Sequence, residues 1–210
     1  MFNFCIFASG AGSNFIEIYR FSKKNSNKMK INLLVSDKVD CGAVKYAKKN
    51  EIDYIIVNVN LFPNAKDQET RIIESLKFYK INYIVLAGYI KKVPIKVIND
   101  FKNKILNIHP SLLPKFGGKG FYGMNVHNAV IQSKESKTGV TIHFVNKDYD
   151  KGPIIYQEEI PVYANDNAEK LSKRVLRLEH KTYKKIISYL INDKIIWNGN
   201  KPEIRKIYND

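Results

Sequence analysis

Cysteine is scarce in this 210-residue chain, and its two cysteines, Cys5 and Cys41, are far apart in the sequence. Two isolated cysteines form neither a disulfide framework nor a zinc site, so a reducing cytoplasm is the expected compartment, and whether the two thiols meet stays open. Long apolar runs are also lacking, since no stretch reaches the roughly 18 residues that a membrane span needs. The opening segment MFNFCIFASG contains no basic residues. The sequence therefore predicts neither a signal peptide nor a membrane partner.

Several catalytic signatures are absent as well. There is no Gly-x-Ser-x-Gly nucleophile elbow and no Gly-Lys-Ser/Thr nucleotide loop. The four histidines, His109, His127, His143 and His180, do not have the spacing of metal ligands, so no metal is expected. These absences favour direct transfer to a substrate, with positioning and oxyanion stabilisation, over covalent or metal-dependent chemistry.

Positive charge is abundant: 35 Lys and Arg residues stand against 20 Asp and Glu residues, a net charge of +15. The basic residues are mostly lysines spread along the chain, and aromatic residues do not alternate with them as in a base-stacking platform. Nucleic acid is therefore a disfavoured partner, although a basic nucleic-acid-binding module stays an alternative. The charge is also compatible with an anionic small-molecule substrate.

The first half of the chain alternates short apolar runs with stretches of helical character. The runs predict strands over 2–8, 31–36, 54–59, 82–88 and 104–109, and the stretches between them predict helices over 13–24, 41–50, 66–79 and 92–101. Continuous apolar strands separated by helices are typical of a parallel sheet in an α/β fold with helices on both faces.

The pattern changes after residue 110. A glycine-rich loop over 115–123 precedes a short helix over 124–133, two strands over 139–145 and 153–162, a long helix over 167–191 and a tail with an Asn198-Gly199 turn signal. The short connection between the two strands favours antiparallel pairing, and Asp166 or Asn167 is the expected N-cap of the long helix. We expect a single domain over 1–210, consisting of a parallel half (1–110), a second part (111–191) and a tail (192–210).

A glycine turn, Ser9-Gly10-Ala11-Gly12-Ser13-Asn14, follows the first predicted strand. Helix N-termini favour phosphate, and Gly12 allows the backbone to approach an anion closely. The third glycine of a dinucleotide fingerprint is missing, because position 15 is Phe. The turn is compatible with a phosphate-sized ligand, and equally with a tight strand-to-helix connection that binds nothing.

Asn107 and His109 lie at the end of the fifth predicted strand, where period-two alternation places both side chains on one face. An amide and an imidazole so arranged could stabilise the oxyanion of an acyl transfer. Asp150, in the loop KDYDKGP, is the candidate carboxylate that would orient the imidazole, with Asp148 as its competitor. Both aspartates also suit an ordinary turn.

The segment LNIHPSLLPKF, followed by TGVTIHFVNKDYDKGPII, resembles the phosphoribosylglycinamide formyltransferase family of folate-dependent enzymes in purine synthesis. ASGAGSN is similar to the family's phosphate-binding turn, VLAGYIKKV to its folate-pocket segment, and RLEHKTY to its late helix. The motifs occur in the family's order over nearly the whole chain. The resemblance implies a Rossmann-like formyltransferase domain, with a mostly parallel central sheet and antiparallel strands in its C-terminal part.

The resemblance also implies a reaction, transfer of the formyl group of 10-formyltetrahydrofolate to the amine of 5-phosphoribosylglycinamide without a metal. It implies that Asn107 and His109 hold the oxyanion and that Asp150 assists His109 in proton transfer. The remaining roles it implies are phosphate binding by Gly12, Ser13 and Asn14, ribose binding by Glu179, and folate binding by Tyr89, Ile90, Lys91, Lys92, Val93, Val145 and Asn146.

Two related activities on the same fold are alternatives. A methionyl-tRNA formyltransferase is expected to carry a further C-terminal RNA-binding domain, and a formyltetrahydrofolate deformylase an N-terminal regulatory domain, so both are disfavoured. The expected enzyme is cytoplasmic, acts on small molecules, and is a monomer or a homodimer.

Overall fold

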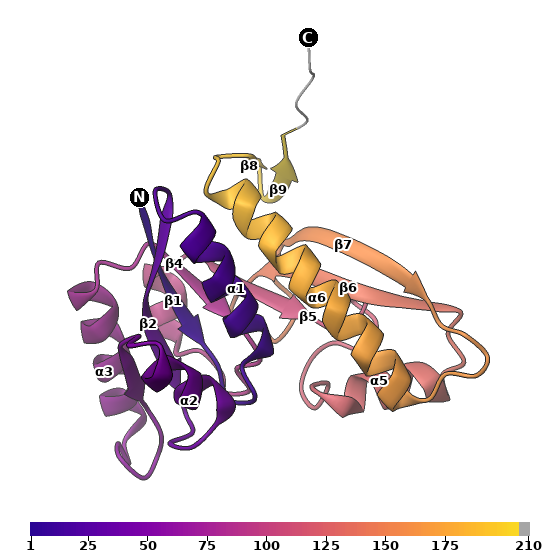
Figure 1. Ribbon diagram of the computed structural model, residues 1–210, viewed down its shortest axis with the longest axis horizontal. Coiled ribbons are helices and arrows are strands. Elements are labelled where there is room, and N and C mark those ends of the chain that lie inside the picture. The colour runs from indigo at the N-terminus through magenta and orange to yellow at the C-terminus, as the bar shows by residue number, and fades with distance from the viewer. Residues whose placement is uncertain (206–210) are drawn as a thin grey trace. The chain divides into compact units, whose positions relative to one another are not determined.

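The computed structural model describes residues 1–205, so the last part of the predicted tail, 206–210, lies outside the described residues. The chain divides into two compact units, Met1–Asn107 and Ile108–Asp210 (Figure 1). The single-domain interpretation stays a prediction. Among the described helices, none combines the length and the apolar character needed to cross a membrane.

The first unit contains five parallel strands in the order β3-β2-β1-β4-β5. The strands are β1 (Phe2–Phe7), β2 (Met29–Ser36), β3 (Tyr54–Ile56), β4 (Tyr83–Leu86) and β5 (Ile105–His109), whose last two residues already belong to the second unit. The helices are α1 (Ser13–Lys24), α2 (Gly42–Lys49), α3 (Ala65–Phe78) and α4 (Ile95–Asp100). Their alternation with the strands is the predicted α/β pattern.

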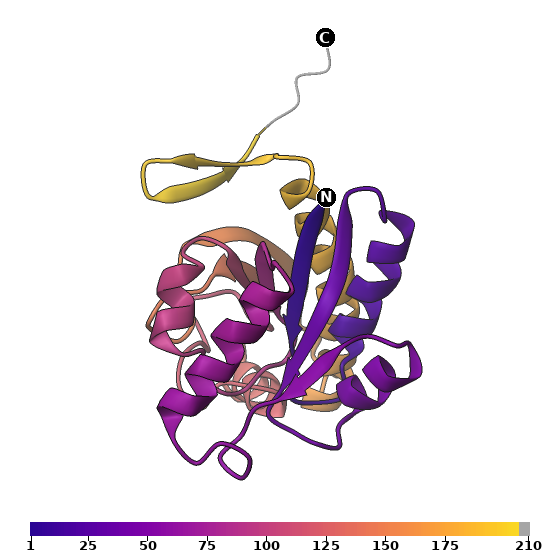
Figure 2. The same ribbon diagram turned by 90° about the vertical axis from the view of Figure 1, so that its left-hand side faces the viewer.

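Helices cover both faces of this sheet. Figure 2 shows α1 and α2 on one side and α3 on the other, and the inner strands are accordingly buried on both faces, as residues 4–8 illustrate. In α1, the buried residues Asn14, Phe15, Ile18 and Ser22 recur at the spacing of one helical face. Burial of this apolar stripe against the sheet is what stabilises the helix.

The second unit is built from longer strands and one long helix. Its elements are α5 (Met124–Gln132), β6 (Lys137–Phe144), β7 (Ile154–Pro161), α6 (Ala168–Leu190), β8 (Ile195–Asn198) and β9 (Lys201–Ile204). Strands β6 and β7 pair in antiparallel orientation, as expected from their short connection. Asn167, one of the two expected N-caps, accepts a hydrogen bond from the backbone N–H of Lys170 at 2.8 Å. The tail hairpin is present as β8 and β9.

Several predicted boundaries differ from the structure: β2 begins at Met29 rather than at 31, and β4 ends at Leu86 rather than at 88. Strand β3 ends at Ile56 rather than at 59, because the side chain of Asn58 accepts hydrogen bonds from the N–H groups of Asn60 and Leu61 and turns the chain. Helix α4 begins at Ile95 rather than at 92, because Pro94 precedes it and disfavours helical geometry in the residue before it. Strand β6 begins two residues earlier than expected, where Lys137 pairs with Pro161.

The predicted fold class is confirmed. The sheet is mostly parallel, with antiparallel strands in the C-terminal part and flanking helices. Most of the predicted site residues follow β1 and β4, lie at the end of β5, or lie in the loop after β6.

Candidate active site

The glycine turn after β1 leads directly into α1. Gly12 has a φ of 78°, which residues with a side chain rarely adopt. A Cβ atom there would also lie 2.8 Å from the Cα of Ala43, so both conformation and space require glycine. Ser13 and the buried Asn14 form the first turn of the helix, where backbone N–H groups lack helical partners and the helix dipole favours anions. The turn has the backbone features of a phosphate site.

This turn is joined to the predicted folate-binding segment after β4. The backbone N–H of Ser9 donates to the carbonyl of Gly88 at 3.1 Å, and the Ser9 hydroxyl accepts from the N–H of Ile90 at 3.2 Å. The ring of Tyr89 packs edge-on against Phe7 of β1. Within the first unit, the structure therefore brings together two segments that are more than 70 residues apart in the sequence.

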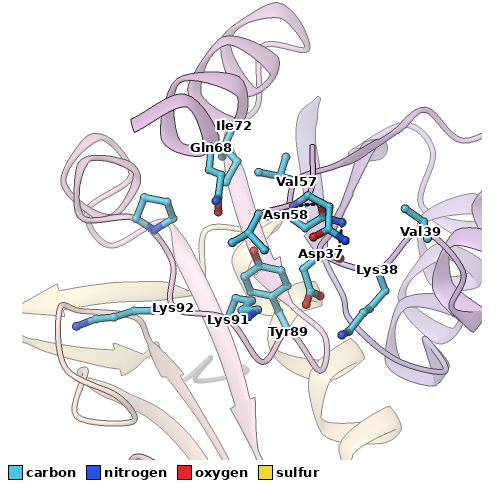
Figure 3. Close-up of a pocket in the computed structure, with 13 residues that line it drawn as sticks. Asp37, Lys38, Val39, Val57, Asn58, Gln68, Ile72, Tyr89, Lys91 and Lys92 are labelled. Atoms are coloured by element: carbon cyan, nitrogen blue, oxygen red, sulfur yellow. Dashed lines mark hydrogen bonds between the residues drawn. The ribbon is translucent and has the colours of Figure 1, made fainter. Parts of the chain in front are cut away.

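A cavity of about 370 Å³ lies beside this segment (Figure 3). Of the predicted folate-binding residues, Tyr89, Lys91 and Lys92 line it, whereas Ile90 and Val93 do not. Lys38 also lines the cavity, so it is flanked by three cationic side chains. Figure 3 shows Asp37, Lys38 and Tyr89 directed into the same space, with Lys92 reaching away. Such a cavity suits a ligand with anionic groups.

At the end of β5, the side chain of His109 is buried between two oxygen atoms. Its Nε2–H donates to the carbonyl of Phe116 at 2.7 Å, and its Nδ1 lies 3.4 Å from Oδ2 of Asp150. Burial lowers the pKa of His109 below the ordinary histidine value, while the Asp150 carboxylate and the Phe116 carbonyl partly offset this effect. Asn107, two residues earlier on the strand, is half-buried.

Asp150 is held by three groups of the second unit. Its Oδ2 accepts a hydrogen bond from the backbone N–H of Gly118 at 2.9 Å, and its Oδ1 lies 3.6 Å from Nε2 of His143. Burial opposes ionisation, but His143, His109 and the Gly118 N–H together hold the pKa of Asp150 below its usual value. The competitor Asp148 is exposed, and its N–H only closes a turn with the side chain of Asn146.

His143 is the functional candidate that sequence reasoning missed. It lies on β6 and is 2% exposed, and its Nδ1–H donates to the carbonyl of Phe144 at 2.8 Å, which directs Nε2 towards Asp150. The signal was present in the sequence, because Thr141 and His143 are polar residues at alternating positions of an otherwise apolar strand. Such a pattern places both on one buried face, where polar groups need partners.

Thr141, the other polar residue of that face, fixes the loop after β5. Its hydroxyl donates to the carbonyl of Ser111 at 2.7 Å and accepts from the N–H of Leu113 at 3.0 Å. Gln157 of β7 donates to the Leu113 carbonyl at 2.9 Å. Since this loop leads to the Phe116 carbonyl and the Gly118 N–H, these bonds help to hold the partners of His109 and Asp150 in place.

A third buried histidine lies near His109. His127 of α5 is 6% exposed, and its Nδ1 has no hydrogen-bond partner within the described part of the chain. Burial, with a smaller contribution from the charge of His109, lowers the pKa of His127 to about 4. His127 is therefore neutral at neutral pH.

The other predicted residues of the second unit lie on the loop after β6 and on α6. Val145 directly follows β6, and the side-chain amide of Asn146 donates to the carbonyl of Lys151 at 3.0 Å. Asn146 thus helps to close the loop that carries Asp150. Glu179 is half-buried on α6, one helical turn before the fully buried Tyr183, and its charge contributes to the raised pKa of that phenol after the larger effect of burial.

Comparison with known proteins identifies the family of the chain. Residues 2–187 match the family model described as formyl transferase. The chain belongs to the formyl transferase family. The phosphoribosylglycinamide formyltransferase of Bacillus subtilis is 34% identical to this formyl transferase over 191 residues, which cover 91% of the chain and 95% of that protein.

Plant and structural relatives agree with this assignment. The chloroplastic phosphoribosylglycinamide formyltransferase of Vigna unguiculata is 45% identical over 197 residues, covering 91% of this formyl transferase and 62% of that protein. The chain therefore spans less than two thirds of the length of that plant relative. The crystal structure of glycinamide ribonucleotide transformylase 1 from Symbiobacterium toebii superposes with a TM-score of 0.89 at 28% identity, covering 98% of this chain and 95% of that chain.

Proposed function

We propose that this formyl transferase moves the formyl group of 10-formyltetrahydrofolate to the amine of 5-phosphoribosylglycinamide, a step of purine synthesis. The observation that carries the proposal is the buried contact between His109, at the end of β5, and Asp150, in the loop after β6, because an imidazole held by a carboxylate suits acyl transfer. The names of the bacterial and plant relatives support phosphoribosylglycinamide as the acceptor of the formyl group. The compartment we propose is the cytoplasm, and the enzyme is a monomer or a homodimer.

In the proposed reaction, the amine nitrogen attacks the formyl carbon, and the carbonyl oxygen becomes an oxyanion. The side-chain amide of Asn107 and the imidazole of His109 donate hydrogen bonds to this oxygen. The Nε2–H of His109 donates to the Phe116 carbonyl in the free protein. The substrate oxygen therefore replaces that carbonyl as the acceptor of this proton.

Collapse of the tetrahedral intermediate breaks the bond from the formyl carbon to the folate nitrogen. The attacking amine must lose one proton and the leaving nitrogen must gain one, so the reaction needs a proton relay but no net acid or base. Asp150 is ionised at neutral pH, since its pKa is held below the usual value. We assign it the proton relay, through water, and the stabilisation of His109 in its protonated form.

The substrate phosphate is assigned to Gly12, Ser13 and Asn14. The positive φ of Gly12 and the lack of room for a Cβ atom beside Ala43 require glycine directly before α1, and a helix N-terminus is a favourable place for phosphate. Glu179 is assigned to the ribose hydroxyls, because a carboxylate accepts hydrogen bonds from vicinal hydroxyl groups.

The folate is assigned to the residues after β4 and β6. Tyr89, Lys91 and Lys92 line the cavity, and the positive charge of the two lysines at its edge would attract the carboxylates of the folate tail. The remaining members of the proposed folate set are Ile90, Val93, Val145 and Asn146. No metal takes part in the proposed reaction.

The test is to mix the purified protein with 10-formyltetrahydrofolate, with and without 5-phosphoribosylglycinamide, and to follow tetrahydrofolate release. We expect release only when the glycinamide is present, and a His109→Ala variant serves as the control for a contaminating activity. Release without the glycinamide would identify a hydrolase instead. No release under either condition would refute the proposed function.

A further inference from the structure

The C-terminal hairpin carries a side chain that no part of the proposed reaction uses. Trp197 of β8 is the only tryptophan of the chain. Its indole stacks on the ring of Phe144, with ring centroids 5.2 Å apart and planes inclined by 28°. Phe144, the last residue of β6, is 2% exposed, whereas Trp197 is 37% exposed. The indole thus shields the phenyl ring from solvent.

The backbone of Phe144 contacts His143 and the far end of the loop that carries Asp150. Its carbonyl accepts the Nδ1–H of His143 at 2.8 Å, and its N–H donates to the carbonyl of Pro153 at 2.9 Å. A Cβ atom at Gly152 would overlap the Phe144 carbonyl oxygen, so the two ends of the loop over 145–152 close directly on this residue. The position of Phe144 therefore sets both the orientation of His143 and the base of the loop that carries Asp150.

The Asp150 loop depends on such external support. Asp150 has a φ of 55°, a left-handed conformation that aspartate tolerates better than most non-glycine residues but that contacts with its surroundings still help to hold. Three consecutive residues of the loop, 147–149, are exposed, so little packing comes from the loop itself. The closed base at Phe144, the histidines and the Gly118 N–H supply the contacts that hold Asp150.

We propose that Trp197 is a positioning residue for the transfer reaction: by stacking on Phe144 it fixes the base of the Asp150 loop and the orientation of His143. The kinetic consequence of this inference rests on the proposed function. The positions of Trp197, Phe144 and the Asp150 loop do not depend on it. The hairpin is then part of the catalytic scaffold rather than a peripheral tail.

The kinetic test compares Trp197→Ala with two further variants. Trp197→Phe keeps a stacking ring, and Asn198→Ala removes the hydrogen bond from Asn198 to Glu203 within the same hairpin but leaves the indole. We expect Trp197→Ala to lower kcat about 10-fold, since small misplacement of catalytic groups has effects of this order or larger. KM for both substrates should change little. Trp197→Phe should restore most of the rate, and Asn198→Ala should match the wild type.

A second readout does not depend on activity. NMR titration of the histidine ring protons reports the environment of His109. The Asp150 carboxylate raises the pKa of this histidine and so partly offsets the lowering by burial. If Trp197→Ala displaces the Asp150 loop, the pKa of His109 falls below its wild-type value. A variant that only loosens the hairpin would lower the thermal unfolding temperature and leave this titration unchanged.

The outcomes separate the two proposals. An inactive wild-type protein would refute the proposed function, while the titration would still decide on the positioning role. If the wild type is active and Trp197→Ala changes neither kcat nor the titration of His109, the positioning role is overturned and the proposed function stands. If Trp197→Ala does not fold, Trp197→Leu, which keeps apolar cover but no flat ring, takes its place. The same directions are expected, and wild-type values of both readouts would overturn the inference.

Discussion

The two units place their candidate site residues by different means. In the unit Met1–Asn107, the glycine turn offers backbone N–H groups, and the cavity beside the segment after β4 is flanked by lysines. In the unit that begins at Ile108, the candidates are side chains buried against one another, with His109 and His143 on either side of Asp150. The first arrangement suits holding an anion, and the second suits moving a proton.

This difference has a consequence for substitution. Backbone N–H groups survive most changes of side chain, so the glycine turn is sensitive only where a Cβ atom cannot fit. A buried histidine–aspartate cluster fails when any member is changed, because the remaining groups lose their partners in a place with little water. We therefore expect substitutions in the cluster of His109, His143 and Asp150 to affect turnover most, and substitutions in the glycine turn to affect substrate affinity most.

The largest expected effect is on His109. His109→Ala should lower kcat by about 10²-fold or more, as the loss of an oxyanion donor does in other enzymes. Steady-state kinetics with thermal unfolding as a control for folding would measure it. Turnover close to that of the wild type would remove His109 from the catalytic machinery and with it the proposed division of roles.

The pair Asp150 and Asp148 sharpens the comparison within one loop. Asp150→Asn should lower kcat by about 10²-fold with little change in KM, because the charge that supports His109 is lost. Asparagine tolerates the left-handed conformation at this position, so the backbone should be kept. Asp148→Asn, at an exposed site, is the matched control and should be nearly neutral. If the effects of these two substitutions were exchanged, Asp148 would be the catalytic carboxylate.

A smaller effect is expected in the first unit, and on a different kinetic constant. Gly12→Ala places a Cβ atom against Ala43 at a φ of 78°, so we expect a loss of about 1–2 kcal/mol in the free energy of unfolding. Displacement of the turn should raise KM for the phosphorylated substrate more than it lowers kcat.

Gly10→Ala is the control for Gly12→Ala in the same turn. A Cβ at Gly10 meets no heavy atom of the described residues within 4 Å, so this variant should behave like the wild type. A Gly12→Ala protein that is destabilised but has an unchanged KM would show that the glycine serves only the fold, and the phosphate assignment would fail.

The sequence predicted the first unit well because its signals are local. Apolar runs give the parallel strands, and Gly10 and Gly12 mark the turn into α1. The early end of β3 required knowing that Asn58 bonds to the following backbone rather than extending the strand. A hydrophobic pattern does not show where a side chain competes with a neighbouring strand for the hydrogen bonds of the backbone.

The second unit contains more that the sequence did not reveal. His109 was selected from its position at the end of a strand, Asp150 from its place in the loop between two strands, and both from the family resemblance. The partnership of His143 with Asp150 depends on a fold that closes the 145–152 loop onto Phe144. The role inferred for Trp197 depends on a contact between residues 53 positions apart. Long-range contacts of this kind need the structure.

The smallest expected effect concerns the buried His127, which is neutral in the folded protein because burial lowers its pKa to about 4. The unfolded chain binds a proton at this residue near pH 6.5. Above that pH both states are neutral and His127 has no effect on stability. As the pH falls from about 6.5 towards 4, only the unfolded state gains the proton, so folding is progressively destabilised.

We expect His127→Gln to remove this dependence, leaving a decrease in the free energy of unfolding between pH 7 and pH 5 that is smaller than that of the wild type by about 1–2 kcal/mol. Urea unfolding at both pH values measures the difference. Asn128→Gln, on the exposed side of α5, is the control and should keep the wild-type dependence. An identical pH dependence in His127→Gln would show that His127 titrates alike in both states. Acid sensitivity would then have to come from other groups, such as Asp150 and Glu158, whose carboxyl pKa values are held below their usual range in the folded protein.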